Sequence, residues 1–299
     1  MTVTHRRTAR ATPSRRARRR LGLLALALAP FALSGCTMSS FGAHPGATSE
    51  GHQTYQLWQG FTIGAIVVGG LTLALIVYAA VRFRVRPGQE GVPRQTQYHL
   101  PLEIVYTVIP VLIVLVLFAF TVVVENNVTA LPAPALTIRV QAFQWGWRFF
   151  YPPAPGTPAG TVKGPYAFTI AGQTTQTPTM EMPANENVRI VLQSLDVVHG
   201  FYLPSFNFSR QALPGVTNEY NFYPQQTGTF FGQCTQYCGL YHSLMWFKVK
   251  VVPAAAYASW ARSQQTQAAN LAAIAAAGAA LSQGRADVPV RPDIGGGTN

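Results

Sequence analysis

The amino-acid sequence predicts a membrane protein in which two transmembrane helices precede one all-β domain. Two uncharged apolar runs, residues 61–81 and 104–124, each contain 21 residues. At about 1.5 Å per residue, a helix of this length crosses a hydrocarbon core of about 30 Å. After residue 130 the sequence changes to short alternating segments separated by Pro and Gly, which is typical of a β-sandwich.

The chain begins with a segment that has the parts of a bacterial signal peptide. Eight of the 22 Lys and Arg residues lie within the first 20 residues, so this segment accounts for most of the net charge of +12 and no nucleic-acid partner is expected. The apolar run 21–33 is too short to span a bilayer, and residues 33–36 (Leu-Ser-Gly-Cys) resemble a lipoprotein lipobox. We expect removal of residues 1–35 and lipidation of Cys36. The alternative is an ordinary signal peptide that leaves Cys36 as a spare thiol.

Residues 36–56 are rich in Gly, Ser and Thr and are expected to form a short exposed linker, followed by a two-helix hairpin over residues 57–125. Residues 82–94, which follow the first apolar run, contain four basic residues and one acidic residue, namely Arg82, Arg84, Arg86, Arg94 and Glu90. This excess predicts a cytoplasmic loop. Both ends of the hairpin then face outward, so we expect a multi-pass protein of the bacterial plasma membrane with its β domain on the periplasmic or extracellular face.

The β domain is expected over residues 130–252. Its clearest strand patterns are Leu136–Phe143, Trp147–Tyr151, Asn187–Ser194, Glu219–Tyr223 and Trp246–Val252. The Pro, Gly and Thr-rich stretch 152–179 is interpreted as an insertion between strands. In the tail, residues 253–299, an Ala-rich helix is expected first and a disordered end after it.

The segment from Cys234 to Met245 contains the strongest functional signal. It holds two Cys, one His and one Met within twelve residues, which is a soft ligand set that copper prefers. A structural zinc site and a disulfide between the two Cys are the alternatives. Neither alternative uses Met245. A second imidazole is available from His199, which follows a strand-like run and would reach this segment only through folding.

Three motifs resemble subunit II of cytochrome c oxidase: Asp196-Val197-Val198-His199, Leu213-Pro214-Gly215, and residues 227–234 with the Cys segment that follows. The resemblance extends over about residues 50–260. It implies a cupredoxin-like Greek-key domain whose metal loop joins the last two strands and holds a dinuclear copper centre, CuA. By position, Cys234 and Cys238 would bridge the coppers, and His199 and His242 would be terminal ligands. Met245 and the backbone carbonyl of Gln236 would be weak ligands.

The same resemblance implies roles for two residues outside the metal loop. Trp145, in Gln-Trp-Gly-Trp, takes the position at which the family accepts electrons from cytochrome c; the alternative is a packing role. Glu103, in Glu-x-x-Tyr-Thr-x-x-Pro, takes the position at which protons enter the path to subunit I. The alternative for Glu103 is a charge that simply ends the membrane span. Tyr106 stands where the family usually has Trp.

Two departures from the family pattern bear on other partners. Gln236 stands where relatives carry a Glu that binds magnesium, so the chain lacks that carboxylate. Residues 131–252 contain seven basic and four acidic residues, too few acids for the acidic patch that docks a basic cytochrome c. The electron donor is therefore expected to be acidic or membrane-tethered.

The resemblance implies a subunit that passes electrons from a cytochrome c through CuA to a haem in subunit I, where oxygen is reduced and protons are pumped. Subunits I and III would be partners, and haem would occur only in the partner. No Cys follows Cys238, so the chain has no c-type haem motif after it. The alternatives are a quinol oxidase subunit II, which would lack the copper ligands, and a copper-handling cupredoxin lipoprotein without an oxidase role.

Overall fold

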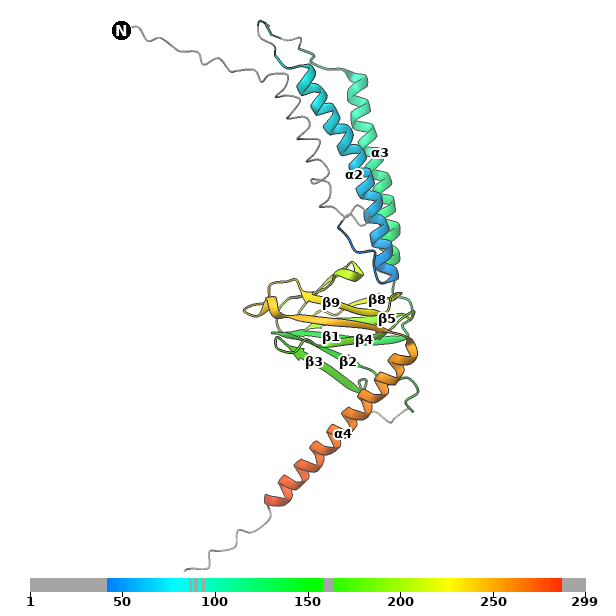
Figure 1. Ribbon diagram of the computed structural model, residues 1–299, viewed down its shortest axis with the longest axis vertical. Helices are drawn as coiled ribbons and strands as arrows, with labels where there is room; N and C mark the ends of the chain where they lie inside the picture. Colours follow the sequence, from blue (N-terminus) through cyan, green and yellow to red (C-terminus); the bar gives the residue numbers. More distant parts are fainter. Residues whose placement is uncertain (1–41, 86–87, 89–90, 93–94, 159–163, 287–299) are drawn as a thin grey trace, which may run out of the picture. The chain divides into compact units, whose positions relative to one another are not determined.

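The computed structural model describes residues 42–85, 88, 91–92, 95–158 and 164–286 (Figure 1). The expected signal peptide, Cys36 and the end of the tail lie outside these residues. The longer elements are α2 (Ser49–Arg82), α3 (Leu100–Val128), β1 (Leu136–Phe143), β2 (Gly146–Tyr151), β3 (Phe168–Gln173), β4 (Thr179–Pro183), β5 (Val188–Ser194), β6 (His199–Leu203), β7 (Phe208–Ala212), β8 (Asn218–Phe222), β9 (Gly228–Cys234), β10 (Trp246–Val252) and α4 (Ala254–Ala286). Two short 3-10 helices, η1 (Pro204–Phe206) and η2 (His242–Leu244), lie in connections.

The two predicted membrane spans lie inside α2 and α3, which contact each other along their length (Figure 1). Among the described residues, these are the two helices long and apolar enough to cross a membrane. Their large apolar side chains are exposed, for example Val67 at 65% and Leu115 at 56%. Lipid or partner helices would cover such side chains. Pro110 lies within α3, which continues past it.

Helix α2 begins earlier than the sequence indicates, so part of the expected exposed linker is helical and buried. Thr48 caps the helix by accepting a hydrogen bond from the Gly51 N–H, and its own side chain is fully buried. The backbone of Ala47 donates to the Ser205 carbonyl over 2.8 Å. Glu50 accepts a hydrogen bond from the Tyr223 N–H. Polar contacts with the β domain hold this first turn of α2, and the turn contains no apolar run. The hydrophobic pattern of the sequence therefore did not reveal it.

The β domain consists of two five-stranded sheets, with strand orders β3-β2-β1-β5-β8 and β4-β10-β9-β6-β7. The five predicted strands correspond to β1, β2, β5, β8 and β10. The interpretation of residues 152–179 as a plain insertion was wrong, because β3 lies within it and pairs antiparallel with β2. Within each sheet one neighbouring pair is parallel, β1 with β5 and β4 with β10. Both are pairs of strands distant in the sequence.

Aromatic and aliphatic side chains from both sheets form the core. In β1, Ile138, Val140 and Ala142 are fully buried and alternate with half-exposed residues, as a strand with one covered face requires. Trp147 of β2 is fully buried and lies 5.0 Å from the ring of Phe247 in β10. This contact joins the two sheets directly beneath the predicted metal loop.

The expected Ala-rich helix is present as α4, and its first turns pack on the β domain. Tyr257 and Ala261 are buried, and the ring of Trp260 meets Tyr151 edge to face with centroids 5.2 Å apart. Gln265 accepts a hydrogen bond from the Ala154 N–H over 2.8 Å. The start of α4 is therefore part of the folded domain.

Candidate metal centre

The strand pairing brings the candidate ligands together at one end of one sheet. Phe201 of β6 lies opposite Cys234 of β9, so His199 at the start of β6 lies close to the end of β9. Strands β9 and β10 pair with Trp246 opposite Gln233, and the loop between them carries the remaining ligands. The Cys234 N–H donates to the Met245 carbonyl over 3.0 Å and closes this loop at its base.

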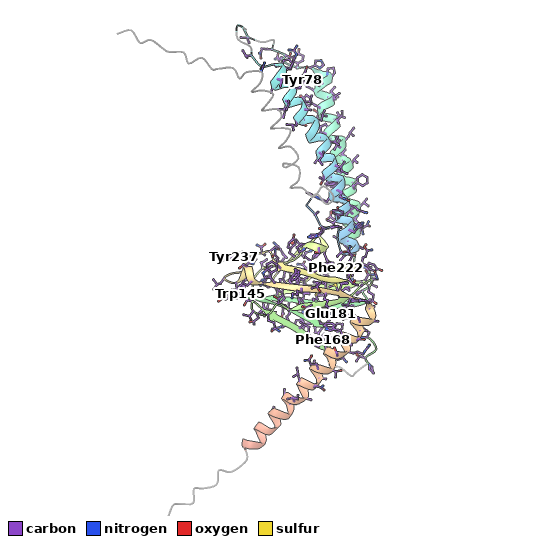
Figure 2. The ribbon with its side chains drawn as sticks, viewed as in Figure 1. Tyr78, Trp145, Phe168, Glu181, Phe222 and Tyr237 are labelled. Atoms are coloured by element: carbon purple, nitrogen blue, oxygen red, sulfur yellow. The ribbon has the colours of Figure 1, made fainter. Side chains whose placement is uncertain are left out.

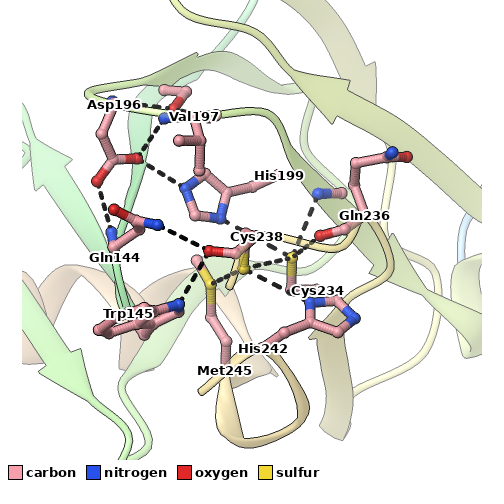
Figure 3. A network of polar contacts seen from close by, with 12 residues as sticks. Gln144, Trp145, Asp196, Val197, His199, Cys234, Gln236, Cys238, His242 and Met245 are labelled. Atoms are coloured by element: carbon pink, nitrogen blue, oxygen red, sulfur yellow. Dashed lines mark hydrogen bonds and ion pairs between the residues drawn. The ribbon is translucent and has the colours of Figure 1, made fainter. Parts of the chain in front are cut away.

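The donor atoms face one another at short and similar distances (Figure 3). The two Cys sulfurs lie 3.8 Å apart. Cys234 Sγ lies 3.9 Å from His199 Nδ1, and Cys238 Sγ lies 3.5 Å from His242 Nδ1. Cys238 Sγ also lies 3.9 Å from Met245 Sδ, and the Gln236 carbonyl lies 3.2 Å from Cys234 Sγ. All six sequence-predicted ligand positions therefore converge.

This donor set fits a metal better than a disulfide. Both cysteines are free, and their sulfur separation is far above the S–S bond length of about 2.05 Å. Donors at 3.5–3.9 Å from each other suit ligands that share a metal ion at about 2.2 Å. The buried Met245 thioether, 1% exposed, faces this cluster, and a thioether favours copper over zinc.

The polar groups around the candidate ligands raise the pKa of His199 and lower the pKa of Cys234. Burial alone would lower the pKa of His199, but Cys234 and Asp196 raise it overall. For Cys234 burial acts to raise the pKa, yet hydrogen bonds with His199 and the Gly200 N–H outweigh it and lower the pKa. The Cys238 pKa is raised by burial and by the nearby charge of Cys234. The lowered pKa favours the thiolate of Cys234, and thiolate is the form that binds metals.

Asp196 holds the imidazole of His199 through the ring nitrogen that does not face the cysteines. Its Oδ1 lies 2.9 Å from His199 Nε2, the ring nitrogen that faces away from the sulfurs. Burial acts to raise the pKa of Asp196, but hydrogen bonds from His199 and from the backbone N–H groups of Gln144 and Val197 lower it. A carboxylate in this place fixes the ring orientation and leaves Nδ1 free for a metal. Sequence reasoning assigned Asp196 no role, although its spacing in Asp-Val-Val-His was a usable signal.

Trp145 lies in the turn between β1 and β2, which belong to the opposite sheet from the ligands. Its indole N–H donates to the Cys238 carbonyl over 3.0 Å, and its ring meets Tyr241 edge to face at 5.0 Å. Trp145 is partly exposed, and Figure 2 places it at the same end of the β domain as Tyr237. The structure thus connects a surface tryptophan directly to a ligand-bearing peptide.

The loop itself exposes large apolar and aromatic side chains and carries no charged residue. Tyr237 and Leu240 are 79% and 77% exposed, and Tyr241, Leu244 and Trp246 are also exposed. No Lys, Arg, Asp or Glu occurs from Tyr220 to Phe247. An exposed patch of this kind marks an interaction surface.

Glu103 lies in the first turn of α3, away from the metal ligands in sequence. Its Oε1 accepts a hydrogen bond from the His99 N–H over 2.8 Å, while the His99 ring accepts from the Leu102 N–H. The carboxylate therefore caps the start of the helix, which the sequence interpretation did not anticipate.

Comparisons with known proteins identify the family of the chain. The family model for the periplasmic domain of cytochrome c oxidase subunit II matches residues 136–252. The chain is 35% identical over 272 residues to a probable cytochrome c oxidase subunit 2 of Streptomyces avermitilis, and the match covers 81% of this chain and 85% of the relative. Cytochrome c oxidase subunit 2 of Mycobacterium tuberculosis is 33% identical over 287 residues, which cover 77% of this chain and 79% of the relative.

A crystal structure of the periplasmic domain of subunit II of the Bradyrhizobium japonicum cytochrome oxidase is also similar. It is 30% identical, the match covers 46% of this chain and 99% of that chain, and the TM-score is 0.39. The sequence matches favour cytochrome c oxidase over the quinol oxidase and copper-handling alternatives. The chain therefore belongs to the cytochrome c oxidase subunit II family, as a two-helix membrane subunit with a cupredoxin-like domain.

Proposed function

We propose that this subunit of cytochrome c oxidase holds the dinuclear copper centre CuA, accepts electrons from a cytochrome c and passes them to a haem in subunit I. The observation that carries the proposal is the convergence of His199, Cys234, Cys238 and Met245 around one small space. When bound, the copper pair would supply one-electron redox chemistry, with the unpaired electron shared over two metals. Oxygen reduction and proton pumping would occur in the partner subunits.

Each ligand residue has a distinct task in this proposal. Cys234 and Cys238 would bridge the metals, while His199 and His242 would bind one metal each. Met245 and the Gln236 carbonyl would complete the coordination as weak ligands. Both cysteines are buried, at 6% and 4% exposure, so the fold excludes water from the bridging sulfurs. The backbone hydrogen bond from Cys234 to Met245 would help to keep the geometry similar in both oxidation states.

The residues near Gln236 do not fit a magnesium ion. Its side-chain amide is neutral, and its Oε1 accepts a hydrogen bond from Gln211 Nε2 over 3.3 Å. Magnesium prefers carboxylate oxygens. Asp196 is already hydrogen-bonded to His199 and to the Gln144 N–H. We therefore assign no magnesium ligand to this loop.

The expected partners follow from the charge of the site surface. Residues 131–252 carry seven basic and only four acidic residues, too few acids to steer a strongly basic cytochrome, which favours an acidic or membrane-tethered donor. Subunits I and III would contact the helices and the domain in the plasma membrane, with the β domain on the periplasmic or extracellular face. In the mature protein, residues 1–35 would be absent, Cys36 would carry lipid, and residues 130–252 would form the copper domain.

The proposal is tested by loading the purified full-length chain in detergent with copper. We expect two coppers per chain, a purple visible spectrum, and an EPR signal from one unpaired electron shared equally by both metals. A blue spectrum from a single copper, or selective binding of zinc, would contradict the proposed centre.

Glu103 is the proposed point at which protons enter the path to subunit I. We expect Glu103→Gln to slow turnover of the assembled oxidase several-fold and to leave the copper spectrum unchanged. Gln keeps an oxygen that can accept the His99 N–H hydrogen bond, so the helix start survives while the proton-carrying group is lost. Turnover is measured as oxygen consumption, with Glu125→Gln at the other end of α3 as the control. Equal turnover of both variants would rule out this role.

A further inference from the structure

The turn Gln144–Trp145 contacts both segments that carry the candidate ligands, although it comes from the opposite sheet. Strands β1 and β2 flank this turn, whereas His199, Cys234 and the loop up to Met245 belong to the sheet that contains β6, β9 and β10. Figure 3 shows Gln144 between Asp196 and Cys238, and Gln144 donates a hydrogen bond to each of them.

Gln144 makes these two contacts with different groups. Its backbone N–H donates to Asp196 Oδ2 over 2.7 Å, and the other oxygen of Asp196 holds His199. Its side-chain amide Nε2 donates to the Cys238 carbonyl over 2.8 Å. Gln144 is thus linked to His199 through Asp196, and to Cys238 through the backbone carbonyl of Cys238.

The Cys238 carbonyl receives two donors, because the Trp145 indole N–H also binds it. A carbonyl oxygen has two lone pairs, so both are used and the peptide plane after Cys238 is held from two sides. The next residue, Gly239, has a φ of +114°, which favours glycine. A Cβ at Gly239 would lie 3.1 Å from Trp145 and 3.3 Å from Gln144, so the backbone approaches the turn closely.

The position of a cysteine sulfur follows from the backbone that carries it. Holding the Cys238 peptide therefore holds Cys238 Sγ at its distances from Cys234 and His242. The amide of Gln144 also directs positive hydrogen atoms toward the ligand segment. Hydrogen bonds of this kind stabilise the more negative, reduced form of a metal centre and raise its reduction potential.

We propose that Gln144 is a positioning residue of the copper centre: it fixes His199 and Cys238 relative to each other and raises the reduction potential. The proposal rests on the copper-binding function proposed above. It assigns the residue before Trp145 a role at the metal, separate from any contact with the electron donor.

The test compares Gln144→Ala and Gln144→Glu in the full-length, copper-loaded chain. For Gln144→Ala we expect retention of two coppers per chain, a fall in the midpoint potential, and unequal copper hyperfine couplings in the EPR spectrum. Gln144→Glu has nearly the same volume, cannot donate to the carbonyl and adds a negative charge, so its potential should fall further. Spectroelectrochemical titration measures the potential without any need for turnover.

Gln141→Ala is the matched control, because Gln141 lies in β1, the strand that leads into this turn, and its side chain accepts a hydrogen bond from Arg148. Its potential and EPR spectrum should equal those of the unmodified chain. The inference is overturned if Gln144→Glu has an unchanged reduction potential. If Gln144→Ala does not retain copper, the potential of Gln144→Glu alone decides the test. An unmodified chain without a two-copper signal would instead refute the proposed function itself.

Discussion

Replacing Cys234 by Ser is expected to abolish the two-copper EPR signal and to reduce electron transfer to oxygen to background. Cys234 Sγ lies between His199 and Cys238 and accepts the Gly200 N–H over 3.5 Å, so it is central to the cluster. A serine hydroxyl is a hard and weakly acidic ligand that does not replace a bridging thiolate for copper. Metal content, the EPR spectrum and oxygen consumption of the assembled oxidase measure the effect.

The control for this substitution is Cys36→Ser, the same chemical change at the cysteine assigned to lipidation. We expect its copper content and EPR spectrum to be normal, because Cys36 lies far outside the metal loop in the sequence. A shared-electron signal that survives in Cys234→Ser would show that the two cysteines do not bridge the coppers.

Replacing Trp145 by Phe is expected to slow electron uptake from a reduced c-type cytochrome by about tenfold or more while the copper spectrum persists. Phe keeps an aromatic ring beside Tyr241 but loses the N–H that joins the surface to the Cys238 carbonyl. Loss of one such hydrogen bond costs about 0.5–1.5 kcal/mol, and about 1.4 kcal/mol corresponds to a factor of ten. Stopped-flow absorbance of the copper centre measures the uptake rate. The Gln144 amide still binds the carbonyl, so the metal geometry should be retained.

Trp246→Phe provides the comparison for Trp145→Phe. Trp246 is a surface tryptophan, 43% exposed, at the start of β10 directly after the loop that carries Met245, and its indole N–H donates to the Ser243 carbonyl. We expect electron uptake in this variant to stay close to that of the unmodified chain. If both variants slow uptake equally, the effect reflects general loss of apolar surface and Trp145 has no special role.

The sequence predicted the elements whose patterns depend on their own residues. The membrane helices carry uncharged runs, and β1 alternates buried and half-exposed residues from Leu136 to Phe143. Other strands escaped prediction because tertiary contacts define them. In β4, Met180, Glu181 and Met182 are all buried, so no alternation is visible. The polar first turns of α2 depend on Thr48 and on contacts with the β domain, which no local pattern reveals.

Residue types and spacing were specific enough to single out the six candidate ligand positions, and strand pairing brings these positions together. Their role as ligands stays a prediction. The supporting residues were not predictable in the same way. Gln144 lies 94 residues from Cys238 in the sequence, and only the packing of opposite sheets brings them to hydrogen-bond distance. The capping role of Glu103 was missed for another reason, since a carboxylate near a membrane boundary fits several roles equally well.

Within one short segment, the metal loop contains both buried residues that face the core and exposed residues that face the surface. Cys234, Cys238 and Met245 point inward and are buried, whereas Tyr237 and Leu240 between them are almost fully exposed. The hydrogen bond between the Cys234 N–H and the Met245 carbonyl closes the segment, so its length is constrained. Substitution of the outward residues would therefore change the exposed surface of the loop while the three buried sulfur side chains keep their positions.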